Sequence, residues 1–267
     1  SIIAVPNRLF CPLGICLLAP NNSDDLHLFI ADSGNHRVKV VNCETDALVG
    51  TIGGDIRGKQ NDQFNYPVGV IIGPSTSNTS ADPLLFVADF FNNRVQVFNA
   101  KTLAYVRTMG SGRGKGPGQL FGPIGICIGD VLSPSNTGTS SYSTEYAVFV
   151  VEYDIRRVSV FNAASGSLIR TIGSGIEGSG PGQLSYPYGV YYLPAGAGSS
   201  NPNGDPHIYV GDCFNKRLTI FNANSGAHVR HIDVGYRPTF ILPATTSDGD
   251  SFIYVGTYDG SLKIVHE

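Results

Sequence analysis

The chain has 267 residues, 42% of them hydrophobic, and a net charge of −3, so it can build an extensive core and gives no global electrostatic reason to expect nucleic acid. No run approaches the roughly 18 apolar residues needed to cross a bilayer, so no membrane partner is expected, and no signal peptide is visible. Five cysteines without paired spacing argue against a disulfide framework or a zinc site and favour a reducing, cytoplasmic compartment. A first residue that is Ser rather than Met suggests a monomeric domain excised from a larger protein, or a processed chain.

One stretch, Leu28–Asn42, returns three times along the chain. The later copies are Leu85–Asn99, Val148–Asn162 and Ile208–Asn222. Each copy is an apolar run, an acidic residue, a short turn, an arginine and a second alternating apolar run, which is typical of a β-hairpin. The arginines recur at intervals of 57, 63 and 60 residues, which indicates a repeat architecture.

The hairpin supplies the two middle strands, b and c, of a longer unit. Before each hairpin stands a Pro-x-Gly motif that opens an apolar strand a, and after it an Asn-initiated turn leads to a strand d. The strand-a motifs begin at Pro12, Pro67, Pro123 and Pro187. Long polar a–b loops are expected at Pro20–Leu26, Gly73–Leu84, Gly129–Tyr146 and Pro194–His207, the third of them solvated. Four-stranded antiparallel units in series predict an all-β propeller, with 1–267 as a single domain.

A fifth unit is degenerate. Strand a begins at Tyr236-Arg237-Pro238-Thr239, strand b is Phe252–Gly256 and strand c is Ser261–Val265, and the chain stops where strand d should follow. The apolar segment Ser1–Val5 precedes the first Pro-x-Gly, in the place of a strand d. We therefore expect five blades, closed by pairing of the N-terminal strand with the C-terminal blade. A six-bladed or incomplete ring is the alternative.

These features resemble the NHL-repeat β-propeller family. The turn Asp32-Ser-Gly-Asn-His-Arg-Val38 matches the family signature with Arg in the third slot, and Pro-Gly-Gln at Pro117–Gln119 and Pro181–Gln183 also matches. The third copy departs from the pattern with Glu152 and Ile155, and the expected five blades depart from the family's common six. The resemblance implies a non-enzymatic interaction module that binds a protein partner, as in substrate-recognition domains of ubiquitin ligases. It also implies an alternative, the binding of single-stranded RNA, which the acidic net charge opposes.

The acid and the arginine of each turn stand five residues apart, where a bidentate ion pair would brace the turn. We interpret these residues as structural rather than as a ring of charges for a ligand. The pairs are Asp32 with Arg37, Asp89 with Arg94, Glu152 with Arg157, and Asp212 with Arg217.

Nothing in the sequence favours catalysis. The glycine-rich stretches Gly110–Gly116 and Gly173–Gly178 lack the Gly-Lys-Ser/Thr and following helix of a phosphate loop, so they are read as blade connectors. Some related propellers resemble metal-dependent lyases or hydrolases, which is the third alternative. The six histidines share no equivalent position on the inner strands, so neither a metal nor another cofactor is expected.

The b–c turns carry large side chains where the family pattern has small ones. Because b–c and d–a connections share one face of a propeller, we expect these aromatic and basic residues to gather as a partner-binding surface. The alternative is that the rings fold down and cap the gaps between blades. The candidate residues are His36, Phe90, Phe91, Arg113, Lys115, Tyr153, Ile155, Arg156, Phe214 and Lys216.

Overall fold

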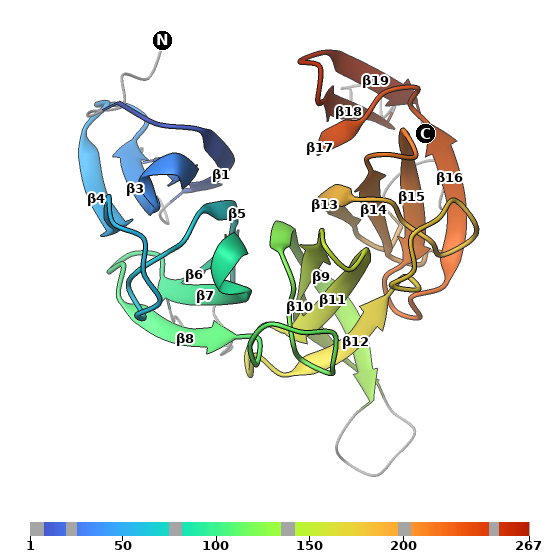
Figure 1. Ribbon diagram of the computed structural model, residues 1–267, viewed down its shortest axis with the longest axis horizontal. Helices are drawn as coiled ribbons and strands as arrows, with labels where there is room; N and C mark the ends of the chain where they lie inside the picture. The colour runs from blue at the N-terminus through green and yellow to red at the C-terminus, as the bar shows by residue number, and fades with distance from the viewer. Residues whose placement is uncertain are drawn as a thin grey trace. The chain divides into compact units, whose positions relative to one another are not determined.

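The computed structural model describes residues 8–19, 26–74, 82–134, 142–196, 204–245 and 251–266 (Figure 1). The chain divides into two compact units, residues 1–124 and 125–267, and each is described by itself. Every regular element described is a strand or a single 3-10 turn. No helix among these residues has the length and apolar character needed to cross a membrane.

The first unit contains two four-stranded antiparallel sheets, or blades, whose strands pair in chain order. In the first blade these are β1 (Pro12–Leu18), β2 (His27–Asp32), β3 (Arg37–Asn42) and β4 (Leu48–Gly53). In the second they are β5 (Pro67–Gly73), β6 (Leu84–Asp89), β7 (Arg94–Asn99) and β8 (Tyr105–Met109). The 3-10 turns η1 (Ser33–Asn35) and η2 (Phe90–Asn92) join b to c and appear as coiled ribbons in Figure 1.

The second unit contains three more blades. The third blade has β9 (Pro123–Pro134), which begins at the boundary between the units, β10 (Tyr142–Glu152), β11 (Arg157–Asn162) and β12 (Leu168–Ile172). The fourth has β13 (Pro187–Leu193), β14 (His207–Asp212), β15 (Arg217–Asn222) and β16 (His228–Asp233). The fifth has three described strands, β17 (Pro238–Thr245), β18 (Ser251–Thr257) and β19 (Leu262–His266).

Alternating side chains of strands b and c form the cores. In the first unit Phe29, Val40, Leu85 and Phe98 are at most 1% exposed and pack in one cluster with Phe64 of the connector between the blades. In the second unit an equivalent cluster between the fourth and fifth blades includes Tyr209, Ile220 and Ile253. Since each strand presents its apolar residues at every second position, a blade buries one face against each neighbour.

The Pro-x-Gly motif allows the inner strands to approach closely. A Cβ built on Gly14 would lie 2.2 Å from the carbonyl oxygen of Val68, on the strand a of the next blade. A Cβ on Gly125 would lie 2.2 Å from the carbonyl oxygen of Tyr188. Both obstacles are backbone atoms, which explains why these positions need glycine.

The expected all-β blades and the three strands of the degenerate fifth unit are present. The expectation of a long loop at Gly129–Tyr146 is wrong, because β9 runs to Pro134 and β10 starts at Tyr142. Val131 is 1% exposed in this extension, so its apolar side chain gives the added strand a buried face. The predicted closing strand Ser1–Val5 lies outside the described residues. All five cysteines are free, in keeping with the prediction that they form no disulfide framework.

Candidate binding surface at the turns between strands b and c

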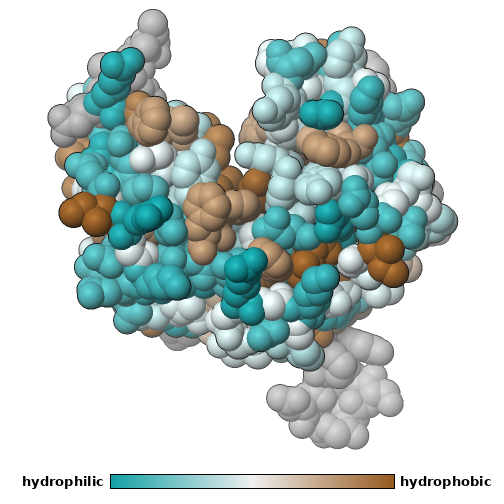
Figure 2. Space-filling view, in the orientation of Figure 1, coloured by the Kyte–Doolittle hydropathy of each residue, from teal (hydrophilic) through white to brown (hydrophobic). Residues whose placement is uncertain are grey.

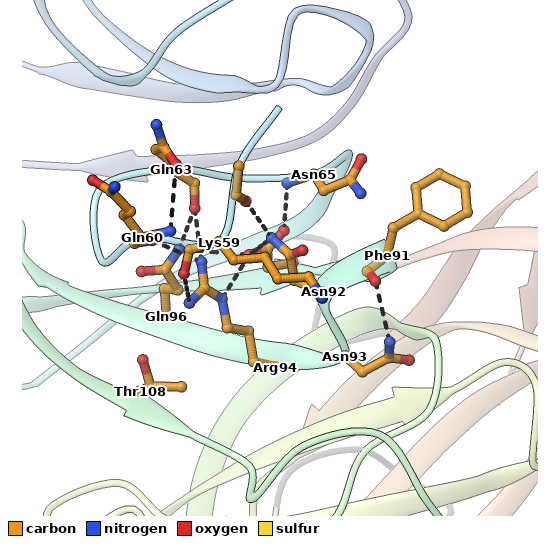
Figure 3. Close-up of polar contacts among 12 residues, drawn as sticks. Lys59, Gln60, Gln63, Asn65, Phe91, Asn92, Asn93, Arg94, Gln96 and Thr108 are labelled. Carbon is orange, nitrogen blue, oxygen red and sulfur yellow. Dashed lines mark hydrogen bonds and ion pairs between the residues drawn. The ribbon is translucent and has the colours of Figure 1, made fainter. Parts of the chain in front are cut away.

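The acid at the end of strand b is the buried centre of each regular turn. The Asp89 side chain is 0% exposed; its Oδ1 accepts the backbone N–H of Asn65 at 2.7 Å, and its Oδ2 accepts Nδ2 of Asn92 and Nε of Arg94, each at 2.8 Å (Figure 3). The other blades repeat the ion pair at 2.8 Å for Asp32–Arg37, 2.7 Å for Glu152–Arg157 and 2.7 Å for Asp212–Arg217.

The arginine joins this acid to the chain entering the blade. Besides its Nε bond to the acid, Arg94 donates from Nη1 to the carbonyl of Lys59 at 2.8 Å, and from Nη2 to those of Gln60 and Gln63 at 2.9 and 2.8 Å (Figure 3). The guanidinium is therefore divided between the carboxylate and the connector, rather than directed at the carboxylate as the sequence suggested. The fourth blade repeats this arrangement, with Arg217 donating to the carbonyls of Ser179 and Gln183.

The asparagine of the turn, like the arginine, joins the acid to the connector. Asn92 donates to the carbonyl of Gly58 at 2.7 Å, and Asn215 donates to that of Gly178 at 2.8 Å. In the third blade this position is Ile155, which is only 3% exposed. The expectation that Ile155 lines an exposed surface is therefore corrected, because its apolar side chain is buried in the turn instead.

These donors also set the ionisation of the acid in the first blade. Burial alone would raise the pKa of Asp32, but hydrogen bonds from the N–H of Phe10, from Asn35 and from Arg37 outweigh it and lower the pKa below its usual value. The lowered pKa favours the charged carboxylate inside the blade.

The last residue of each regular b–c turn has a left-handed backbone. The four residues are His36, Asn93, Arg156 and Lys216, with φ between 53° and 56°. Nδ1 of His36 accepts the N–H of Tyr66 at 3.1 Å, and Oδ1 of Asn93 accepts the N–H of Gly122 at 3.0 Å. His36, expected at a partner-binding surface, therefore has a clear role in joining neighbouring blades.

Arg156 also joins neighbouring blades, through its charged guanidinium. Its guanidinium carbon lies 4.7 Å from the centroid of the Tyr186 ring, and its Nη2 lies 3.0 Å from Oε2 of Glu177. The side chain is 22% exposed, so most of it serves the junction between the third and fourth blades. A smaller part of it remains at the surface.

A ladder of rings continues from this junction in the second unit. The rings of Tyr153 and Tyr186 have centroids 5.0 Å apart, and those of Tyr186 and Phe214 are 4.6 Å apart. The guanidinium carbon of Arg237 lies 4.5 Å from the centroid of Phe214. Phe214 is nevertheless 46% exposed, so neither the ring ladder nor the cation removes it from solvent.

Further exposed side chains surround the end of the ladder. Tyr236 is 43% exposed and Tyr258 is 74% exposed, while the N–H of Tyr258 donates to the carbonyl of Arg237 at 2.9 Å. Lys216 is exposed two residues after Phe214. We call Phe214, Lys216, Tyr236, Arg237 and Tyr258 the aromatic–basic patch.

The first unit has a smaller counterpart. Phe91 is 56% exposed and packs edge-on against Phe90 and Tyr66, with centroids 4.8 and 5.7 Å apart. Arg113 and Lys115 are exposed on the following connector, and the guanidinium carbon of Arg113 lies 4.3 Å from the Phe121 centroid. In the space-filling view, hydrophobic side chains form separate brown patches among hydrophilic ones (Figure 2).

Sequence reasoning missed part of this surface. In the sequence, Tyr236 and Arg237 mark only the start of the fifth strand a. They nevertheless stand before Pro238 as Ser185 and Tyr186 stand before Pro187 in the fourth blade. This shared offset was the available signal. In the structure, the guanidinium of Arg237, which belongs to the fifth blade, lies over the ring of Phe214.

The described residues include histidines, carboxylates and free cysteines, the usual metal ligands and nucleophiles. Within these ranges there is no group of three or more His, Cys, Asp or Glu side chains that could hold a metal ion. Burial raises the pKa of Cys16 to about 12, against an opposing backbone hydrogen bond from Ile72, so this thiol stays protonated and is a poor nucleophile.

Comparisons with known proteins agree with the blade architecture. No family model matches the chain. A stretch of 106 residues, 38% of the chain, is 34% identical to the NHL repeat-containing protein 2 of Bos taurus, and it spans only 13% of that protein's length. A crystal structure described as BBS1N in complex with ARL6DN, soaked with lead, matches with a TM-score of 0.56 at 12% identity, covering 95% of this chain and 67% of the other. The fold is a five-bladed β-propeller, and the suspected resemblance to the NHL-repeat family is supported.

Proposed function

We propose that this chain is a non-enzymatic interaction module whose 267 residues act as one propeller domain and bind a protein segment at the b–c and d–a turns. The propeller fold and the similarity to an NHL repeat-containing protein support an interaction module in general terms. The observation that carries the specific proposal is the half-exposed Phe214 ring beneath the Arg237 guanidinium.

This pair has the composition expected of a recognition site. Aromatic residues and arginine are enriched where protein interfaces are energetically important, because they bury a large area and still offer directed polar contacts. Arg237 is exposed above Phe214, so its N–H groups can meet carboxylates or carbonyls of a bound segment. The buried acid–arginine network holds the turns in place and limits the entropy lost when the partner binds.

Single-stranded RNA is the second candidate, because exposed rings beside arginine can also stack with bases. The net charge of −3 disfavours it, as does the sharing of Arg156 with Glu177. Phosphate contacts give binding that weakens steeply with salt. A protein segment held largely by apolar contacts should respond to salt much less.

The experiment is selection of peptides from a random display library on the immobilised chain, followed by titration of the selected peptides at low and physiological salt. We expect selected peptides to bind with little salt dependence and to lose affinity for Phe214→Ala. Val106→Ala is the matched control, since Val106 is 43% exposed on β8, away from the turns. Equal binding to both variants would contradict the proposed site, and a single-stranded oligoribonucleotide that binds with a steep salt dependence would favour RNA.

A further inference from the structure

Two histidines lie together on the outer strand of the fourth blade, away from the turns. His228 pairs with Phe221 of β15, Arg230 pairs with Ile220, and His231 pairs with Thr219. Val229 is the extra residue of a β-bulge between these pairs. In a regular strand, residues three apart point to opposite faces, but one inserted residue brings them to the same face.

The nitrogens of the two rings converge. Nε2 of His228 lies 3.4 Å from Nδ1 of His231, and the ring centroids are 4.3 Å apart. A metal ion with Zn–N bonds of about 2.0–2.1 Å and tetrahedral angles holds two ligand nitrogens roughly 3.4 Å apart. The separation of the two nitrogens therefore matches the span that one ion requires.

A third polar atom, Oγ1 of Thr219, lies beside His231. Oγ1 of Thr219 lies 3.2 Å from Nδ1 of His231, and it donates to Oδ2 of the buried Asp212 at 3.1 Å. The Thr219 oxygen therefore lies beside the His231 imidazole, within reach of an ion bound there. The positive charge of Arg217 acts on both imidazoles, and Arg217 itself pairs with Asp212 at 2.7 Å.

Both imidazoles are partly buried on β16. Burial, followed by the positive charge of Arg217, lowers the pKa of both His228 and His231. Neutral imidazole is a preferred ligand of copper, nickel and zinc ions.

We propose that His228 and His231 form a binding site for one divalent transition-metal ion, with the Thr219 hydroxyl beside it. With only two imidazoles from the protein, water completes the coordination. The bound ion therefore exchanges with ions in solution, and the fold does not depend on it. The site is independent of the partner-binding proposal, and it lies on an outer strand rather than on the inner strands.

The test is calorimetric titration of the whole chain with Zn²⁺, Ni²⁺ and Cu²⁺. We expect one ion per chain, with Cu²⁺ bound most tightly, following the usual order for nitrogen ligands. His228→Gln and His231→Gln should each weaken binding by about tenfold or more, because even groups around metal ligands contribute about 10–100-fold. His36→Gln is the control, since it removes an imidazole in the other unit and should leave binding unchanged.

A variant with a second histidine pair distinguishes binding by two histidines in this geometry from incidental binding elsewhere, for example at cysteines. Tyr105 and Thr108 occupy the same bulged positions of β8, and their Oη and Oγ1 atoms lie 2.9 Å apart. Tyr105→His with Thr108→His should add a second ion of similar affinity. The proposal is overturned if the native chain binds no ion, if the two glutamine variants bind as tightly as it does, or if the double variant gains no site while keeping its fold by circular dichroism.

Discussion

Nε of Arg94 lies 2.8 Å from Oδ2 of Asp89, and the remaining nitrogens of the same guanidinium hold three carbonyls of the connector entering the blade. One side chain thus pairs with a fully buried carboxylate and holds the connector between two sheets. The aromatic side chains of the turn surface are carried on this network of buried hydrogen bonds.

Removing this arginine should lower the stability of the fold substantially. Arg94→Ala leaves the 0% exposed carboxylate of Asp89 without its charge partner and is expected to lower the free energy of unfolding by about 3–5 kcal/mol. Lys101→Ala breaks the exposed pair with Asp82 and should cost about 1 kcal/mol or less. Urea unfolding of the two variants measures the difference, and similar losses would show that the buried pair has no special role.

The glycine of the Pro-x-Gly motif should tolerate no side chain. Gly14→Ala places a methyl group 2.2 Å from the Val68 carbonyl, and the backbone shift needed to relieve it should cost about 1–3 kcal/mol. Gly54→Ala is the control, because a Cβ there meets no atom within 4 Å. Melting temperatures of the pair provide the comparison; an unchanged value for Gly14→Ala would mean that the inner strands separate easily.

The two interpretations of the turn aromatics predict different stabilities. If Phe214 serves recognition, Phe214→Ala should cost about 1 kcal/mol or less, in the range of surface changes, because the ring is 46% exposed. Phe98→Ala, which removes a fully buried ring, should cost about 3–5 kcal/mol. A loss for Phe214→Ala as large as that for Phe98→Ala would mean that the ring is a structural cap.

The sequence predicted the repeat, the strands of each blade and the acid–arginine pairs, because these follow from period-2 alternation and from spacing along the chain. The role of Asn92 could not be predicted, since its partner Gly58 is 34 residues away and is brought near only by packing of the connector. The contact of Arg237 with Phe214 could have been anticipated, because Arg237 stands directly before Pro238 as Tyr186 stands before Pro187. The convergence of His228 and His231 depends on a bulge, and no residue type marks a bulge reliably.

Stability should fall as the pH is lowered below neutrality. The folded-state pKa of His231 is lowered by burial, then by Arg217 and His228, with Asp212 opposing, whereas the unfolded histidine titrates near 6.5. The unfolded chain therefore binds more protons at mildly acidic pH, so this stability is complete above about pH 7 and declines as the pH falls through about 6.5. His231→Gln should flatten the dependence of melting temperature on pH between about 7.5 and 5.5. An unchanged slope in that variant would show that other groups dominate.

The most direct test of the central claim is the affinity of a selected peptide for the native chain and for Arg237→Ala, measured at physiological salt. If the aromatic–basic patch is the docking site, losing this guanidinium should weaken binding by about 2 kcal/mol, or roughly 30-fold, as expected for an interface hot spot. An affinity for Arg237→Ala equal to that of the native chain, with the fold intact, would contradict the claim.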